Sequence, residues 1–318
     1  DQLATLSKTH ALTPMVGRTL LQDAAPLSLG LMIGKWLGSL TQVIDGMLDH
    51  SRRGLPVQFG GAVGSLDGLR GKGQKVSKLL ATRLGLRAPS LPWHTDRLPW
   101  LDLGHSARKA GVLFGKVSAD LLFMSQTALK EAEEAFKGGS SAMPHKQNPV
   151  GLLALRAVSQ KVITAAAALD ALAIHEHERA VGFWHAEWDA ITDLWEATVA
   201  LSEIAHDCLR NISFNEIALR ASLDRDLGLV FSLPLKNALE KAGAGAQAAR
   251  ISDELCSHAR EKNISLKEAA HESKVLKSLL SPDQLEEAFD PSLLLKEQIP
   301  LVEKAISDWF DLSREVRQ

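Results

Sequence analysis

Apolar residues recur along most of this chain at the spacing of α-helices. After Pro26 they return every three or four residues, which places them on one face of a helix. The same spacing predicts further helices over roughly 106–135, 155–172 and 191–208. In one of these stretches the alternation is strict, through Leu155, Val158, Val162, Ala165, Leu169 and Leu172. Such a seam is typical of long helices that pack at shallow angles, so we predict an elongated all-α bundle.

The helical pattern changes near residue 212. After Asn211 the long seam ends, and shorter helical patterns follow, with breaks at residues 242–245, at Asn263 and at Pro282. We therefore expect a central long-helix bundle domain over residues 1–211. A smaller C-terminal helical domain is expected over residues 212–318.

The segment 138–149 interrupts the bundle pattern with the sequence GGSSAMPHKQNP. Its paired glycines, paired serines and prolines do not continue a helix, and Pro149 is expected at the first position of the next one. Amides of consecutive Gly and Ser residues can form a concave nest of donors, and Lys146 adds a positive charge. This loop is suited to holding a carboxylate, although a plain connection between helices is the alternative.

Composition excludes some classes of function. The net charge of −2, with mixed signs, offers no basic face for nucleic acid and no polybasic patch for a membrane. Because Gly, Lys or Asp interrupts the longest apolar runs, we expect no membrane span. The two cysteines, Cys208 and Cys256, lie far apart in helical patterns, which indicates no disulfide framework and favours a reducing cytoplasm.

The sequence of this loop resembles the signature G-S-S-x-M-P-x-K-x-N-P of the fumarase/aspartase superfamily. The form with His after the proline is similar to two branches, the adenylosuccinate lyases and the bacterial 3-carboxy-cis,cis-muconate cycloisomerases. In that superfamily the first Ser of the motif handles the proton on the carbon next to a carboxylate, which implies this role for Ser140. The resemblance also implies catalytic Lys146, and substrate contacts from Ser141, Met143 and Asn148.

A second segment, 15–26, resembles the superfamily wording G-R-T-H-x-Q. The resemblance implies substrate contacts from Arg18, Thr19 and Gln22, with a structural salt bridge as the alternative for Arg18. Leu20 stands where adenylosuccinate lyases carry a His that binds substrate or acts as an acid. The cycloisomerases tolerate an apolar residue there, so this position favours them.

The sequences of two further segments, 55–65 and 175–188, resemble the corresponding sequences of the cycloisomerases. Gln58 is expected to donate a hydrogen bond to a substrate carboxylate. His175 and Arg179 are four residues apart, so we expect them on one helix face towards an anionic substrate, with Arg179 as a bidentate clamp. The zinc pattern H-E-x-x-H is absent from the sequence, and we expect no metal.

The resemblance implies a cofactor-free isomerase that lactonises 3-carboxy-cis,cis-muconate, or a related 3-substituted muconate, in aromatic-acid breakdown. It also implies a homotetramer whose active sites are shared between subunits. Because the superfamily's first signature region lies upstream, an N-terminal domain is expected to be missing. The alternatives are an adenylosuccinate lyase or related β-elimination lyase, and a non-catalytic structural or binding relative.

Overall fold

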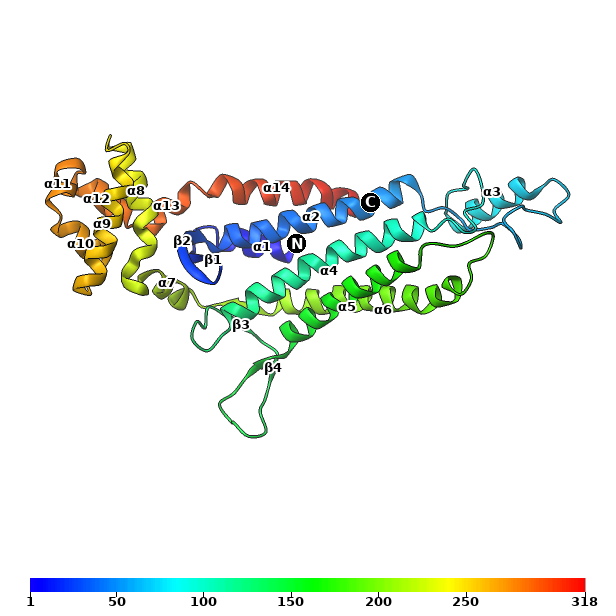
Figure 1. Cartoon of the computed structure of the whole chain (residues 1–318), viewed down its shortest axis with the longest axis horizontal. Coiled ribbons are helices and arrows are strands. Elements are labelled where there is room, and N and C mark those ends of the chain that lie inside the picture. Colours follow the sequence, from blue (N-terminus) through cyan, green and yellow to red (C-terminus); the bar gives the residue numbers. More distant parts are fainter. Residues whose placement is uncertain (318) are drawn as a thin grey trace. The chain divides into compact units, whose positions relative to one another are not determined.

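The computed structural model describes residues 1–317, which fold mainly into α-helices (Figure 1). The helices are α1 (Gln2–Thr9), α2 (Leu29–Arg53), α3 (Gly73–Leu84), α4 (Leu98–Met124), α5 (Val150–Leu172), α6 (Phe183–Arg210), α7 (Glu216–Asp224), the 3-10 helix η1 (Asp226–Phe231), α8 (Ser232–Lys241), α9 (Gln247–Lys262), α10 (Leu266–Glu272), α11 (Lys274–Leu279), α12 (Pro282–Ala288), α13 (Pro291–Lys296) and α14 (Ile299–Val316). Three two-stranded pairings join them: β1 (Pro14–Thr19) with β2 (Gln22–Ser28), β3 (Ala132–Glu134) with β6 (Ile212–Phe214), and β4 (Lys137–Gly138) with β5 (Asn148–Pro149). The predicted all-α class is confirmed.

The chain divides into two compact units, each assembled from segments far apart in the sequence. Unit 1 contains Asp1–Gly38, Met124–Glu133 and Ser213–Asp311. Unit 2 contains Ser39–Phe123, Glu134–Ile212 and the chain from Leu312 onward. The division of the chain near residue 212 stays a prediction.

The core of unit 2 forms along the seam predicted from the sequence. Leu155 and Val162 of α5, and Leu194 and Leu201 of α6, are buried completely or almost so. Helix α4 approaches α5 closely at Gly111, where a Cβ would lie 3.0 Å from the Ser159 carbonyl oxygen. These helices are the scaffold from which the loops of unit 2 extend.

Unit 1 buries a second core among the shorter helices after residue 212. Leu223, Leu235 and Leu255 are among its buried residues, and Val16 of β1 belongs to the same cluster. The expected breaks occur where the sequence places them: Asn263 ends α9 in the left-handed conformation, and Pro282 opens α12 behind a capping box. Helix α14, with 18 residues, is longer than the short helices that the pattern predicts.

The hairpin formed by β1 and β2 was not predicted from the sequence. Its register runs from Pro14 opposite Ser28 to Thr19 opposite Gln22. Leu20 and Leu21 form the turn with positive φ angles of 51° and 63°, and their side chains are exposed. Turns of this kind are usually built from Asn and Gly, so the sequence carried no recognisable hairpin signal.

Two of the predicted helices have wrong boundaries. The helix expected over 106–135 begins at Leu98, whose amide is capped by Asp96, and ends at Met124, where the Glu131 amide bonds back to the Met124 carbonyl. The helix after the loop begins at Val150 rather than Pro149. Both errors are at helix ends, where caps and reversals override the apolar period.

The expectation about membrane spans was too strong. Within residues 1–317, α5 is the one helix long and apolar enough to cross a membrane by length and composition. A helix in the core of a soluble protein passes the same test, so this observation carries little weight.

The core of unit 2 should depend strongly on Leu155. Replacing this fully buried residue (Leu155→Ala) should lower the free energy of unfolding by about 3 kcal/mol, because the missing atoms leave a cavity between packed helices. Urea denaturation followed by circular dichroism measures the change. Leu79→Ala, on the exposed side of α3, is the matched control and should change little. Equal effects of the two substitutions would contradict the assignment of Leu155 to the core.

Candidate functional site

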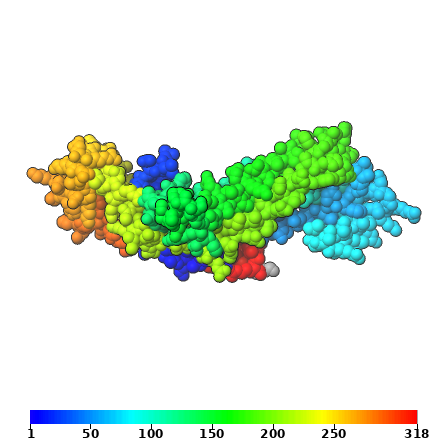
Figure 2. Space-filling view, turned by 90° about the horizontal axis from the view of Figure 1, so that it is seen from below, coloured from blue at the N-terminus to red at the C-terminus, as the bar shows by residue number. Residues whose placement is uncertain are grey.

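The serine loop, residues 138–148, is held as a hairpin in unit 2. Gly138 pairs with Asn148 across β4 and β5, and Figure 1 shows the loop between β4 and α5. Figure 2 shows this green segment on the surface that faces the viewer. The segment is therefore reachable from solvent, as a substrate-binding loop requires.

Inside the loop, the half-buried Ser140 accepts a hydrogen bond from a backbone amide. The Met143 amide donates to Ser140 Oγ at 3.2 Å, and Asn148 Nδ2 donates to the Gly139 carbonyl at 3.4 Å. Lys146 and Ser141 are exposed. A donor aimed at a hydroxyl oxygen stabilises negative charge there, which lowers the energy of a deprotonated Ser140.

The hairpin of β1 and β2 is anchored by a buried carboxylate of unit 1. Arg18 Nη1 and Nη2 donate to Glu131 at 2.7 and 2.6 Å, and Arg18 Nε donates to Asp23 at 3.0 Å. The Glu131 side chain is 0% exposed and also accepts a hydrogen bond from Ser222 Oγ at 2.6 Å. These hydrogen bonds from Arg18 to Glu131 raise the pKa of Arg18 above its ordinary value.

The pairs with Glu131 and Asp23 orient the hairpin and together use three of the guanidinium N–H groups of Arg18. A substrate contact by Arg18 stays a prediction, as do those by Thr19 and Gln22. Both of the latter are exposed at the end of the hairpin, on either side of its turn.

His175 and Arg179 do not share a helix face, so that expectation is wrong. Residues 173–182 form an irregular connection between α5 and α6, in which His177 and Gly182 have φ angles of 50° and 90°. Backbone in the left-handed region does not continue an α-helix, and the two side chains consequently enter different surroundings.

His175 lies in a buried ionic cluster. Its side chain is 1% exposed, and its Nε2 lies 3.6 Å from Glu187 Oε2. Glu187 is paired with Arg97 at 3.0 Å. Burial and then the charge of Arg97 lower the pKa of His175, so its neutral form is favoured. His175 therefore contributes to the packing of this segment, and its contact with substrate stays a prediction.

Arg179 is exposed and lies against residues of two other segments. Its Nη2 donates to the Ala62 carbonyl at 3.2 Å and lies 3.2 Å from His94 Nε2, while its guanidinium stacks on Trp184 at 4.5 Å. Gln58, in the same segment as Ala62, is also exposed. The structure thus brings together the segments 55–65 and 175–188, whose sequences resemble the cycloisomerases, and places His94 beside them.

Sequence reasoning missed three buried carboxylates, which bond to the β1–β2 hairpin, to the start of α5 and to Arg97. Glu131, Glu134 and Glu187 are all buried, whereas the sequence around 131–134 was predicted to be a helix end. The available signal for the first two was the pair of acidic residues three apart, Glu131 and Glu134, shortly before the glycines of the serine loop.

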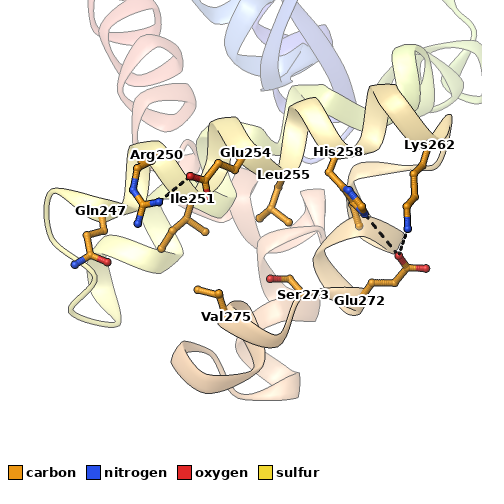
Figure 3. A pocket seen from close by; sticks show the side chains of 11 residues that line it. Gln247, Arg250, Ile251, Glu254, Leu255, His258, Lys262, Glu272, Ser273 and Val275 are labelled. Carbon is orange, nitrogen blue, oxygen red and sulfur yellow. Dashed lines mark hydrogen bonds and ion pairs between the residues drawn. The ribbon is translucent and has the colours of Figure 1, made fainter.

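A separate cavity of about 600 Å³ lies in unit 1 between α9, α10 and α11 (Figure 3). Its charged residues pair with one another: Arg250 with Glu254, and both His258 and Lys262 with Glu272. None of the predicted site residues lines it. In the part of the chain that the structure describes, no group of three or more His, Cys, Asp or Glu is arranged to hold a metal ion.

Known proteins resemble this chain over nearly its whole length. A family model described as a lyase matches residues 1–164. The 3-carboxy-cis,cis-muconate cycloisomerase of Pseudomonas aeruginosa is 32% identical over 318 residues, covering 99% of this chain and 69% of that protein. The nitrosuccinate lyase of Streptomyces davaonensis is 31% identical over 315 residues, covering 96% and 66%. A crystal structure of 3-carboxy-cis,cis-muconate lactonizing enzyme from Pseudomonas putida has a TM-score of 0.89 at 30% identity, covering 98% and 70%. The chain thus spans about two thirds of the length of these relatives.

The buried ion pair should stabilise unit 1. Glu131→Gln should lower the free energy of unfolding by about 2 kcal/mol, because Arg18 loses a charged partner while the buried amide keeps only part of the hydrogen bonding. Thermal and urea unfolding measure this change. Glu315→Gln is the control, because Glu315 pairs with Arg52 at the surface and its loss should have little effect. An equally small effect of Glu131→Gln would show that the ion pair does not anchor the hairpin.

Proposed function

We propose, since this chain belongs to the lyase family, that it is a cycloisomerase that lactonises 3-carboxy-cis,cis-muconate or a closely related 3-substituted muconate. The resemblance to the fumarase/aspartase superfamily is borne out by the lyase model and by cycloisomerase relatives over most of the chain. The observation that carries the proposal is the serine loop, in which the Met143 amide donates to Ser140 Oγ and which also carries the exposed Lys146. The reaction would serve the breakdown of aromatic acids.

The reaction is an intramolecular addition without loss of any group. One substrate carboxylate oxygen bonds to a carbon of the conjugated diene, and the electron pair of that double bond moves towards the neighbouring carboxylate. Ser140 then delivers its proton to the α carbon and recovers one from solvent. No protein base is needed for the attacking carboxylate, so the task of the protein is to orient the substrate and to stabilise charge.

The residues around Ser140 have complementary tasks in this scheme. The amide of Met143 and the ammonium of Lys146 stabilise the transient alkoxide and the charge on the substrate carboxylate. Ser141 and Asn148 orient the same carboxylate. Gln58 and Arg179, both exposed, bind another carboxylate of the substrate, and Thr19 and Gln22 supply further hydrogen bonds.

The assembly is a homotetramer in this proposal, with active sites shared between subunits. In the apolar window of α5 only 39% of the residues are buried, and Leu153 remains 49% exposed. Val112 of α4 and Val199 of α6 are exposed as well. Helices of other copies would cover these apolar faces, which monomeric proteins rarely leave open.

Both cysteines are free thiols, which supports a reducing compartment such as the cytoplasm.

A β-elimination lyase is the second candidate. The nitrosuccinate lyase relative, which is nearly as similar as the cycloisomerase, favours it. Elimination removes a proton from the carbon next to a carboxylate, the reverse of the protonation step above. Nitrosuccinate and adenylosuccinate are therefore tested beside the muconate, and turnover of none of these substrates would favour a non-catalytic relative.

Removing the proton donor should abolish turnover. With 3-carboxy-cis,cis-muconate, Ser140→Ala should lower kcat by about 100-fold to 10,000-fold, the range expected for loss of a general acid. Loss of the conjugated-diene absorbance in the ultraviolet measures the rate. Ser278→Ala, at an exposed position of α11 in unit 1, is the matched control and should keep the wild-type rate. A near-normal rate for Ser140→Ala would exclude Ser140 as the proton donor.

The exposed face of α5 should be covered by other copies. Leu153→Arg should reduce the mass of the particle measured by light scattering, because a charge in an apolar interface is costly to bury. Leu79→Arg, on exposed α3, is the control and should leave the mass unchanged. Helicity should stay the same in both variants. An unchanged particle mass for Leu153→Arg would exclude this face from the assembly.

A further inference from the structure

The serine loop has an incoming arm, residues 134–138, and an outgoing arm, residues 148–152. Two glycines let these arms pack closely against each other. Gly138 is on the incoming arm, and a Cβ there would lie 2.5 Å from Val150 Cγ1 on the outgoing arm. Gly151 is on the outgoing arm, and a Cβ there would overlap Glu134 Oε1 of the incoming arm. The missing side chain of Gly138 leaves room for Val150, and the missing side chain of Gly151 leaves room for Glu134.

Glu134 caps the helix that follows the loop. Its side chain is almost fully buried, and its Oε2 accepts a hydrogen bond from the Leu152 amide at 3.2 Å, in the first turn of α5. Pro149, at the N-cap position of α5, makes no side-chain cap. The first amides of a helix lack partners within it and favour a negative charge, so a carboxylate from outside the helix supplies the missing acceptor.

The same carboxylate is only partly satisfied. Within residues 1–317, Glu134 Oε1 has no hydrogen-bond partner, and the nearby Cys208 of α6 is also buried. Burial raises the pKa of Glu134, while the hydrogen bond from the Leu152 amide acts in the opposite direction. A buried polar atom without a partner costs free energy, so a compensating structural role is expected for this side chain.

What it secures is the geometry of the loop. On the incoming arm, the Ala135 amide donates to the Asn211 carbonyl at 3.1 Å, which ties this arm to the end of α6. Glu134 ties the outgoing arm to the same place. Without Glu134, the two arms would still be joined below Ser140 by the short ladder of β4 and β5 and by the hydrogen bond from Asn148 Nδ2 to the Gly139 carbonyl, both at the level of Gly138 to Asn148 rather than at the start of α5.

From this geometry we propose that Glu134 is a positioning residue that clamps the base of the serine loop and thereby places Ser140 for proton transfer. The clamp acts through the amides of α5 and does not touch substrate. Its effect on rate rests on the proposed function, whereas its effect on loop order does not. Preorganised donors and acids lose much of their effect when displaced by about 1 Å, so a small opening of the base is enough to slow the reaction.

The test compares an isosteric variant that keeps the acceptor with one that removes it. Glu134→Met has a similar volume but no strong acceptor, and it should raise hydrogen exchange across residues 138–148 at least fivefold. It should also lower kcat by about tenfold to 100-fold, with a smaller change in KM. Glu134→Gln retains an acceptor oxygen and should restore most of the loop protection and of kcat. Rescue by Gln separates positioning through the α5 amides from mere filling of space.

Two glycine variants complete the test. Gly151→Ala should displace the carboxylate and reproduce the loop exchange of Glu134→Met, so the proposal remains testable even if Glu134→Met does not fold. Gly46→Ala is the matched control, because nothing lies within 4 Å of a Cβ at that position of α2, and it should change neither readout.

If Glu134→Met keeps the wild-type hydrogen exchange of the loop and the wild-type kcat, the proposed role of Glu134 is wrong. It is also wrong if Glu134→Met and Glu134→Gln change both quantities equally. If the wild-type protein turns over no muconate, the proposed function fails. Hydrogen exchange then still decides whether Glu134 orders the loop.

Discussion

A carboxylate that leaves water must find hydrogen-bond donors or a cation, and this requirement holds the functional segments of the chain in place. Glu131 meets it with Arg18 and Ser222 in unit 1, which anchors the hairpin of β1 and β2. Glu134 meets it in part, through the Leu152 amide in the first turn of α5 in unit 2, at the base of the serine loop. Neither carboxylate is available to solvent, so each acts by holding segments of the protein in place rather than by binding ligand.

The chemistry proposed for the loop explains why a cycloisomerase and a β-elimination lyase resemble this chain almost equally. Lactonisation adds a proton to the carbon beside a carboxylate, and elimination removes one. Both pass through a state in which negative charge accumulates on that carboxylate, and both need the same donors around Ser140. In the proposed function, substrate choice comes from residues that bind the remaining substituents, and Gln58 and Arg179 are the proposed candidates. Both are exposed, and Arg179 donates a hydrogen bond to Ala62, in the same segment as Gln58.

The apolar period predicted the long helices well because they depend on a local repeat. Helices α2, α5 and α6 lie where the three-and-four spacing placed them, and Leu155, Val162 and Leu194 are fully buried. The prediction failed where a local rule was absent. A hairpin with a Leu-Leu turn lacks the usual turn residues, and α4 ends at a reversal that its apolar residues do not mark.

The order of residues was enough to predict the all-α class and the interruption of the bundle at 138–149, because these depend on neighbours along the chain. Ser140 became a candidate through the resemblance of this loop to a superfamily signature, and its role stays a prediction. Tertiary structure alone decided which charged residues are buried. Arg18 meets Glu131 across 113 residues, and Arg97 meets Glu187 across 90. His175 and Arg179, only four residues apart, have opposite surroundings, one buried and one exposed. Burial and ion pairing depend on which distant segments pack together, and no local period in the sequence reports that.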